Sequence, residues 1–380
     1  MEKEFELIKF YSQNNRLTIP FGVNYSSEVQ LGFNNIRLTI LLLYFFIETL
    51  INISIAIPGL LNETQRIFLG DFILITFSTK ATESRVGFFA QMLYKFSAIS
   101  MLINFCIDRN HLWLKEASEI FEKLKTRSLI MKLEKISKIS QKIAFFNVIA
   151  RTLIISTTVF TTCWWIVKKY PLYIWLPGIL MCEIFAIISP IVEIQFLTDL
   201  LIMCEIASST FEDLNSSLKN IYQNMSLEKY IERFDLTCIF VNKIMIYIKK
   251  LFILFYTINI SFIILFIWQT LKPGNAMIHM IGMINFVIVE FIMVLLVSQF
   301  IGKIDRMAKR SEELVFKKYF LLNKNYQQKT LWKMRKYFSI CWGQTISLKF
   351  LGQSINLETS IKIITIILTA IAVVINNSKN

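Results

Sequence analysis

The sequence predicts an all-α membrane protein with seven transmembrane helices. Hydrophobic residues make up 54% of the chain and aromatic residues 14%, and the mean hydropathy is +0.52. Soluble domains average about 45–50% apolar residues. Several windows are largely apolar over the roughly 20 residues that a helix needs to cross a bilayer core about 30 Å thick. Basic residues are also distributed unevenly between the two sides of these windows, which fixes an orientation.

The first element expected is a membrane helix that inserts by itself. Four of the first six residues are charged and no apolar core of a signal peptide follows them, so we expect no cleaved leader. Seven spans are expected in order, at 38–57, 86–107, 143–167, 178–204, 251–269, 279–302 and 359–377.

The orientation follows from the Lys and Arg residues in the segments between the spans. With the N-terminus inside, the inner segments hold 31 of them and the outer segments hold seven. Basic residues are retained on the cytoplasmic side of membrane proteins. The N-terminus is therefore predicted to be cytoplasmic and the C-terminus extracellular, in a multi-pass plasma-membrane protein. The net charge of +14 then reflects topology, and nucleic acid is not an expected partner.

The connections divide the chain into regions. Long inner connections carry apolar residues at spacings of three and four between charges, which predicts amphipathic cytoplasmic helices that pack on each other. Outer connections carry Pro-Gly pairs at 58–59, 177–178 and 273–274, which predict turns, and Pro190 is expected to interrupt a span. The predicted regions are a cytoplasmic segment 1–37, spans 1–4 at 38–204 with a helical loop 108–142, cytoplasmic helices 205–250, spans 5–6 at 251–302, cytoplasmic helices 303–352 and a last span 353–380.

Catalytic and metal-binding chemistry is not indicated. The two histidines, His111 and His279, fall on opposite sides of the predicted membrane, and no Gly-rich phosphate loop is present. We therefore expect no enzyme activity, no cofactor and no metal. The six cysteines have no paired ligand spacing; a bridge between Cys163 and Cys182 is the one plausible outer disulfide. Receptor, channel and transporter remain as classes.

The last span carries a narrow polar stripe. At about 100° per residue one face presents Lys362, Thr365, Thr369, Ala372 and Asn376, while the other faces are almost entirely Ile, Leu and Val. Lipid does not solvate polar groups. The stripe therefore faces other protein, as a helix contact glued by small and polar residues, or water, as the wall of a pore built by several subunits. We expect Lys362 to snorkel to the interface or to pair with Glu358.

The end of the chain resembles the closing motif of insect gustatory receptors, a branch of the superfamily that also contains the odorant receptors. That motif is a glycine after an aromatic residue, then Thr-Tyr, an aliphatic run and Gln-Phe. Here Phe350-Leu351-Gly352 precedes Thr369 and an aliphatic run, with Ala370, Asn376 and Asn377 in place of Tyr, Gln and Phe. The segment RFDLTCIFVNKIMIYIKKLFILFYT resembles the family's approach to span five.

The resemblance implies a homotetrameric or heterotetrameric, ligand-gated, nonselective cation channel with a taste role. Its last helix would line a central pore, and cytoplasmic helices would anchor the subunits to each other. Asn376 would take the place of the family glutamine at the outer gate, with Ala372 or Val373 one turn below and Thr365 and Thr369 along the wall. Membrane lipid and permeant cations are the other expected partners.

A small organic tastant is the implied ligand, held in the outer half of each subunit between spans two and six. Projecting that region onto this chain gives Phe89, Tyr94, Thr161, Trp164, Trp165, Glu183, Phe262, Trp268, Gln269 and His279. Each aromatic residue also fits an interfacial belt or a packing role. Glu183 is the most informative, because a carboxylate within a membrane is costly. Arg151 is expected to pair with Asp199 or Glu205.

Two rival classes stay open. A G-protein-coupled receptor also has seven helices, but it predicts an outer N-terminus and a cytoplasmic tail. A secondary transporter would favour internal repeats and helices broken by Gly or Pro, and the sequence shows no repeat.

Overall fold

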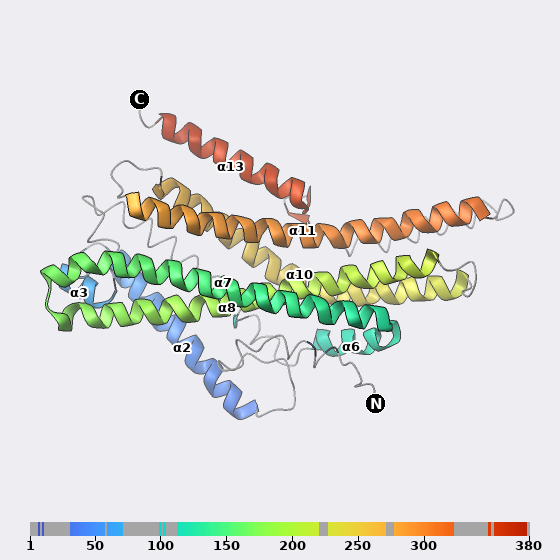
Figure 1. Ribbon diagram of the computed structural model, residues 1–380, viewed down its shortest axis with the longest axis horizontal. Coiled ribbons are helices and arrows are strands. Elements are labelled where there is room, and N and C mark those ends of the chain that lie inside the picture. Colours follow the sequence, from blue (N-terminus) through green and yellow to red (C-terminus); the bar gives the residue numbers. More distant parts are fainter. Residues whose placement is uncertain are drawn as a thin grey trace.

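The protein is an elongated helical bundle (Figure 1). The computed structural model describes residues 31–57, 59–70, 112–219, 227–270, 277–322, 349–350 and 353–377, together with 7, 10, 99–100 and 102–103. The elements are α2 (Leu31–Ala56), α3 (Glu63–Phe68), α6 (Leu112–Leu124), α7 (Arg127–Lys169), α8 (Leu172–Lys219), α10 (Leu227–Thr270), α11 (Met277–Leu322), β1 (Lys349–Phe350), β2 (Gln353–Ser354) and α13 (Leu357–Asn377).

Four helices are far longer than a membrane span. They are α7, α8, α10 and α11, of 43 to 48 residues, or roughly 65–70 Å at 1.5 Å per residue, about twice the thickness of a bilayer core. The region boundaries expected after 204, 250 and 302 fall inside α8, α10 and α11 without a break. Each predicted span on these helices is therefore one section of a longer rod.

Three stretches are long and apolar enough to cross a membrane among the described residues: Ile36–Ile55, Glu232–Leu265 and Val287–Ser311. They overlap the predicted spans one, five and six. The predicted span 86–107 lies almost entirely outside the described residues. Seven spans and their orientation stay predictions.

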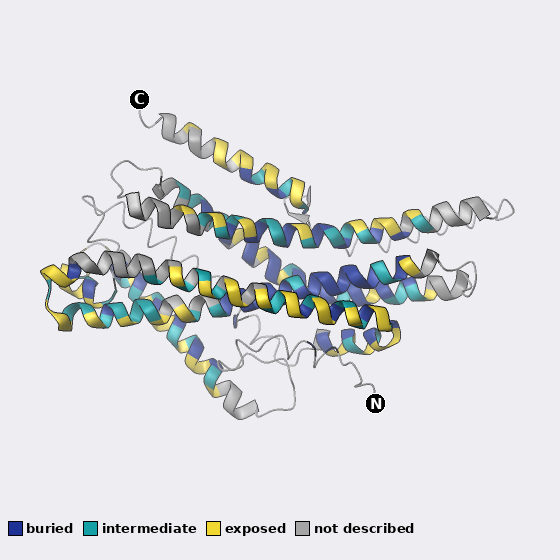
Figure 2. Ribbon diagram, in the orientation of Figure 1, coloured by how far each residue is buried: buried dark blue, intermediate teal, exposed yellow. Residues whose placement is uncertain are grey.

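One end of the bundle is built from amphipathic helices. Along α6, Leu114, Ala117, Phe121 and Leu124 are buried at spacings of three and four, and the Phe121 ring lies 5.6 Å from that of Phe240 on α10. Figure 2 shows this alternation of buried and exposed positions on α6. The amphipathic face of α6 thus packs against α10.

The turn between α7 and α8 lies elsewhere than expected. The chain turns at Tyr170 and Pro171, where the Tyr170 amide still donates to the Ile166 carbonyl, and α8 begins at Leu172. Pro177 and Gly178 lie inside α8, so the turn predicted there is wrong. Pro190 also lies within the continuous helix. Gly59 does form a turn, with φ of 75°, and the pair at 273–274 lies outside the described residues.

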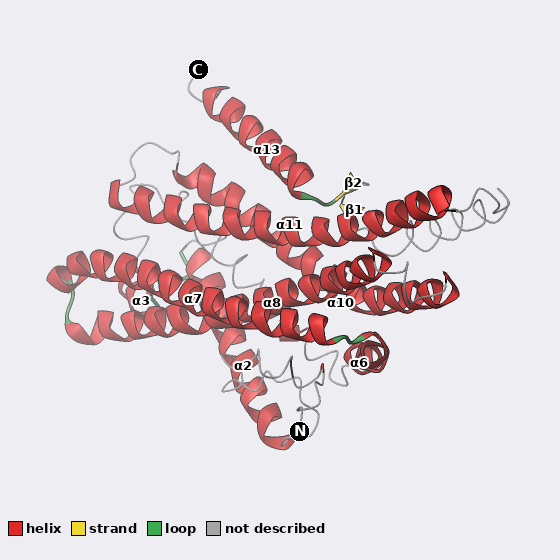
Figure 3. Ribbon diagram, turned by 45° about the vertical axis from the view of Figure 1, so that its right-hand side comes forward, coloured by secondary structure: helices red, strands yellow, loops and turns green. Residues whose placement is uncertain are grey.

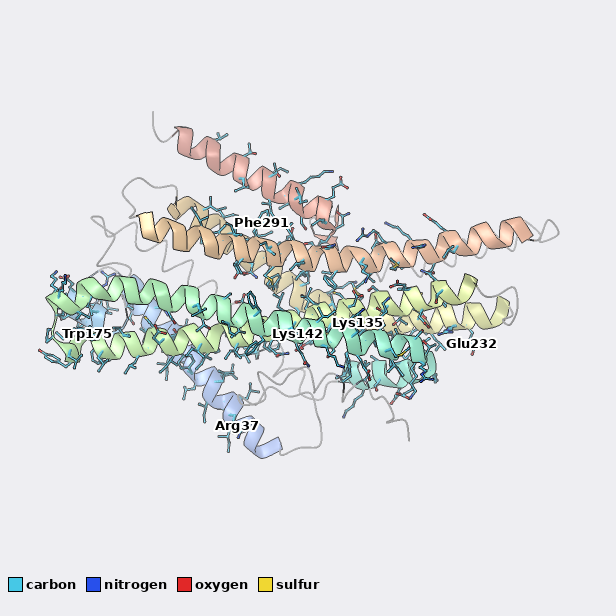
Figure 4. All side chains as sticks on the ribbon, viewed as in Figure 1. Arg37, Lys135, Lys142, Trp175, Glu232 and Phe291 are labelled. Atoms are coloured by element: carbon cyan, nitrogen blue, oxygen red, sulfur yellow. The ribbon has the colours of Figure 1, made fainter. Side chains whose placement is uncertain are left out.

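The short helix α3 closes this turn-bearing end of the bundle. The Asn62 side chain accepts from the Gln65 amide, and the Gln65 side chain accepts from the Asn62 amide, so both ends of a capping box are formed. Ile67 packs with Ile166 and with partly buried residues of α8, among them Trp175, which Figure 4 labels beside α3.

Gly70 sits against α8 in a left-handed conformation with φ of 89°. A Cβ added there would lie 3.0 Å from Cys182 Sγ and 3.2 Å from the Gly178 carbonyl oxygen. Only glycine combines this conformation with this approach. The Cys182 thiol donates to the Gly70 carbonyl at 3.3 Å and is not in a disulfide, so the bridge to Cys163 is not formed.

The last helix follows two antiparallel strands of two residues each, β1 and β2, in which Lys349 pairs with Ser354 and Phe350 with Gln353. The first part of α13 contacts α11 and α10. From there the helix diverges, and its C-terminal end stands away from the bundle in both views (Figures 1 and 3).

Candidate functional site

The last helix is attached to its own subunit by one narrow face near its start. Ser360 and Ile364, four residues apart, are buried. The Ser360 hydroxyl donates to Ser298 Oγ on α11 at 2.8 Å, and the Tyr256 hydroxyl on α10 donates to Ser360 Oγ at 3.2 Å. All three side chains are fully buried. We call Tyr256, Ser298 and Ser360 the hydroxyl latch, because they join three helices at one point.

Close backbone packing reinforces this attachment. A Cβ on Gly302 of α11 would lie 3.2 Å from Asn356 Cβ and 3.3 Å from Asn356 Cα. Asn356 caps α13, since its side-chain oxygen accepts from the Thr359 amide at 2.8 Å. The start of α13 is therefore held against α11 by hydrogen bonds and by the close packing that the absence of a side chain at Gly302 permits.

The polar stripe lies on another face of α13. At about 100° per residue, Thr365 and Thr369 lie about 120° to 160° around the helix from the buried pair, and both are exposed. Their hydroxyls donate to the Ile361 and Thr365 carbonyls at 2.8 Å. This part of the stripe does not pack within its own subunit. The side chains of Ala372 and Asn376 lie outside the described residues.

Exposed apolar residues flank the stripe on both sides. On the same helical projection, Leu357, Ile361 and Leu368 lie along one border, and Ile366 and Val373 lie along the other. Their exposed fractions run from 38% at Leu357 to 68% at Ile366, and Figure 2 shows exposed positions along the first part of α13. A single subunit thus presents a polar strip between two apolar borders.

Lys362, at the inner end of the stripe, pairs with Glu358 as predicted. Its Nζ lies 2.7 Å from Glu358 Oε1, and both side chains are exposed. The hydrogen bond from Lys362 lowers the pKa of Glu358 below its ordinary value. The carboxylate offsets the lysine charge near the start of α13.

Of the ten predicted ligand residues, the structure describes the side chain of Glu183. It accepts a hydrogen bond from Ser156 Oγ at 2.7 Å, which joins α7 to α8, and it is half-buried. The helices place Thr161, Trp164 and Trp165 on α7, Phe262, Trp268 and Gln269 on α10, and His279 on α11. Their side chains, and the whole of Phe89 and Tyr94, lie outside the described residues.

The sequence interpretation missed several buried polar residues. Tyr256 and Asn259 on α10 and Ser298 on α11 are each 0% exposed. Both side-chain polar atoms of Asn259 have no hydrogen-bond partner within the described part of the chain. An amide in the middle of an apolar run was the signal that could have singled out Asn259, because polar groups within a membrane are costly.

The predicted pairing of Arg151 with Asp199 or Glu205 stays a prediction, because the Arg151 side chain is not among those that the structure describes. Glu205 on α8 pairs with Lys303 on α11, at 2.5 Å, while Asp199 accepts from Gln195 at 3.1 Å.

Ion pairs gather at the end of the bundle that carries α6. Asp213 on α8 is the centre of one network: it accepts from Arg233 Nη2 at 2.8 Å, from Ser128 Oγ at 2.8 Å and from Thr126 Oγ1 at 3.0 Å. Lys132 pairs with Glu212, and Lys243 with Glu116. Figure 4 shows Lys135 and Glu232 toward this end and Trp175 at the opposite end. Within the described ranges no group of three or more potential ligands could hold a metal ion.

With this geometry in place, solved structures provide the comparison. The chain matches the olfactory receptor OR5 of the insect Machilis hrabei with a TM-score of 0.57 and 8% identity, over 97% of this chain and 98% of the receptor. The chain has the fold of an insect olfactory receptor. The same receptor in complex with eugenol matches with a TM-score of 0.51 and 11% identity, over 97% and 96% of the two chains. No family model and no curated protein sequence matches, so the likeness to the olfactory receptor is one of fold.

Proposed function

We propose that this protein is a subunit of a ligand-gated, nonselective cation channel that acts as a chemosensory receptor, with a small organic tastant as ligand. Four subunits surround a pore lined by α13, and the protein lies in the plasma membrane with its N-terminus in the cytoplasm. The olfactory-receptor fold over nearly the whole chain supports the chemosensory class, and the gustatory-type closing motif around Thr369 supports a taste role.

The observation that carries the pore is the exposed polar strip of α13. Thr365 and Thr369 face away from their own bundle. Their hydroxyl protons are bonded to backbone carbonyls, so the strip presents oxygen lone pairs, which lipid does not solvate. Burying the two apolar borders against neighbouring copies would leave the strip facing a shared axis. In such a ring each subunit contributes one strip, so water and cations meet threonine oxygens along the wall.

The orientation is supported by the distribution of charge along the bundle. Ion pairs such as Arg233–Asp213 and Lys243–Glu116 gather at the α6 end, where long helices continue past the length of a span. The opposite end carries Trp175 and the apolar cluster around Ile67. A cytoplasmic anchor at the charged end and a membrane interface at the aromatic end agree with the excess of basic residues on the inner side.

Ligand binding in the outer half of the bundle is proposed to act through the hydroxyl latch. The neighbour solved with eugenol binds a small organic molecule, and Glu183 with the aromatic residues of α7 and α10 would form the corresponding site here. Tyr256 on α10 contacts Ser360 on α13, so a movement of α10 reaches the last helix directly. The ligand must bind the open form more tightly, because equal affinity for both forms shifts no population.

Purified protein in planar bilayers tests the proposal without any G protein present. Recording with a panel of small organic compounds should show ligand-evoked cation current. Tags at the two termini of the protein in intact cells should be reached from opposite sides of the membrane. An accessible N-terminal tag, or signalling that needs a G protein and shows no current, would favour the receptor class that does not form a pore.

A further inference from the structure

The strongest unexplained feature is the buried carboxamide of Asn259 on α10. Its exposed fraction is 0%, and neither Nδ2 nor Oδ1 has a hydrogen-bond partner among the described residues. Buried polar side chains nearly always have a partner, and an unsatisfied one costs free energy. A ligand group that reached Nδ2 and Oδ1 would satisfy both atoms.

We propose that Asn259 is the polar anchor of the ligand site and that it takes an uncharged molecule bearing a hydroxyl group, an alcohol or a phenol. This inference rests on the proposed function and adds the ligand class and the anchoring residue. A carboxamide donates through Nδ2 and accepts through Oδ1. A hydroxyl both accepts and donates, so one hydroxyl satisfies both atoms, whereas an ammonium group satisfies only the oxygen.

The remainder of the ligand is apolar. Phe255 and Ile263, four residues to either side of Asn259 along α10, are buried in the main core, as is Phe252. Residues four apart share a face of a helix. Apolar walls with a single polar anchor are the usual composition of a site for a small organic molecule.

The position of Asn259 also explains how binding reaches the last helix. Tyr256, whose hydroxyl donates to Ser360 of α13, precedes Asn259 by three residues and lies on the adjoining part of the same helical face. A hydroxyl bound at Asn259 therefore sits one turn of a rigid helix from the hydroxyl latch. Asn259 acts on the ligand, and Tyr256 passes the change in α10 to α13.

Binding measurements on the purified full-length protein test this anchor. The probes are eugenol, benzyl alcohol and geraniol, each beside its methyl ether, which keeps the oxygen acceptor but loses the donor. Affinities are measured by ligand-induced thermal shift. At least one alcohol is expected to bind, and its ether should bind about 10-fold more weakly, the value of roughly one hydrogen bond.

Two variants complete the test. Asn259→Leu removes both polar atoms at similar volume and should weaken the alcohol about 10-fold and erase its advantage over the ether. Asn259→Ser, which keeps a hydroxyl, should restore part of that advantage. The matched control is Asn52→Leu on α2, a buried amide already bonded to the Glu48 carbonyl; its alcohol affinity should be unchanged.

Each result decides the proposal. Equal affinities for Asn259→Leu and the unmodified protein would overturn it and leave an ordered water as the partner of Asn259. Failure of every alcohol and phenol to bind would overturn the ligand class. Binding that depends on Asn259 without any evoked current in bilayers would refute the channel and leave the site standing. Evoked current that ignores Asn259→Leu would refute the site alone.

Discussion

Replacing Asp213 with Ala should destabilise the α6 end of the bundle far more than replacing its neighbour Glu212. The Asp213 side chain is 13% exposed and its partner Arg233 is 24% exposed, and the carboxylate also accepts from Ser128 and Thr126. Glu212 is 46% exposed and pairs with Lys132 at the surface. The two residues are adjacent in sequence, so they form a matched pair.

The magnitudes follow from burial. Removing the Asp213 carboxylate leaves a partly buried guanidinium without its counter-ion and two hydroxyls without an acceptor, which costs about 2–4 kcal/mol. The exposed pair at Glu212 contributes about 0–1 kcal/mol. For 380 residues at roughly 2 cal/mol/K per residue, the entropy of unfolding is about 0.8 kcal/mol/K, so these costs correspond to melting-temperature losses of about 3–5 °C and about 1 °C.

Thermal unfolding of the purified protein in detergent, followed by tryptophan fluorescence, measures both shifts. Asp213→Asn should lie between the two alanine variants, because it keeps an oxygen acceptor and loses the charge. Equal losses for Asp213→Ala and Glu212→Ala would refute the reasoning, since they would show that burial and partner number at Asp213 do not set its contribution.

Three further outcomes are expected. Gly302→Val should displace the start of α13, because even a Cβ would lie 3.2 Å from Asn356. It should therefore change ligand-evoked current more than Gly302→Ala does. Equal currents in the unmodified protein and both variants would contradict the close approach of α13 to α11. Hydrogen bonds from Tyr170 and Lys169 lower the pKa of Glu63 below its ordinary 4.5. Ionised Glu63 therefore stabilises the docking of α3 above pH 4.5, and this stability is lost as the pH falls below that value. The difference in tryptophan emission between the unmodified protein and Trp175→Phe should change as the pH falls below 4.5, and a difference that stays flat down to pH 3 would count against this role of Glu63. Glu183→Ala should shift the dose response for an activating ligand about 10-fold or more, while an unshifted curve would remove Glu183 from the ligand site.

Local pattern predicted the parts of the structure that depend on neighbours in sequence. The buried spacing of Leu114, Ala117, Phe121 and Leu124 follows from helical periodicity within α6, and the pairing of Lys362 with Glu358 follows from one turn of α13. Both patterns are set by the period of a single helix, so the sequence was sufficient to predict them.

Helical periodicity could not predict contacts between segments that are distant in the sequence. Glu205 pairs with Lys303, 98 residues away, because α8 and α11 pack together. No spacing rule in the sequence connects these two residues. Pro177 was expected in a turn, yet near the exposed start of α8 it costs a single backbone hydrogen bond, the one that the Tyr173 carbonyl would accept. The hydroxyl latch joins residues from three helices, so it becomes visible only when those helices are placed.

The central claim is that water reaches the polar strip of α13 in an assembly of subunits. The most direct measurement is block of ligand-evoked current by a cationic methanethiosulfonate reagent applied to Thr369→Cys, compared with Ile364→Cys on the buried face, where the native side chain is 5% exposed. Rapid, irreversible block of Thr369→Cys with no effect on Ile364→Cys is predicted. Current that persists in modified Thr369→Cys, or block at Ile364→Cys instead, would contradict the account.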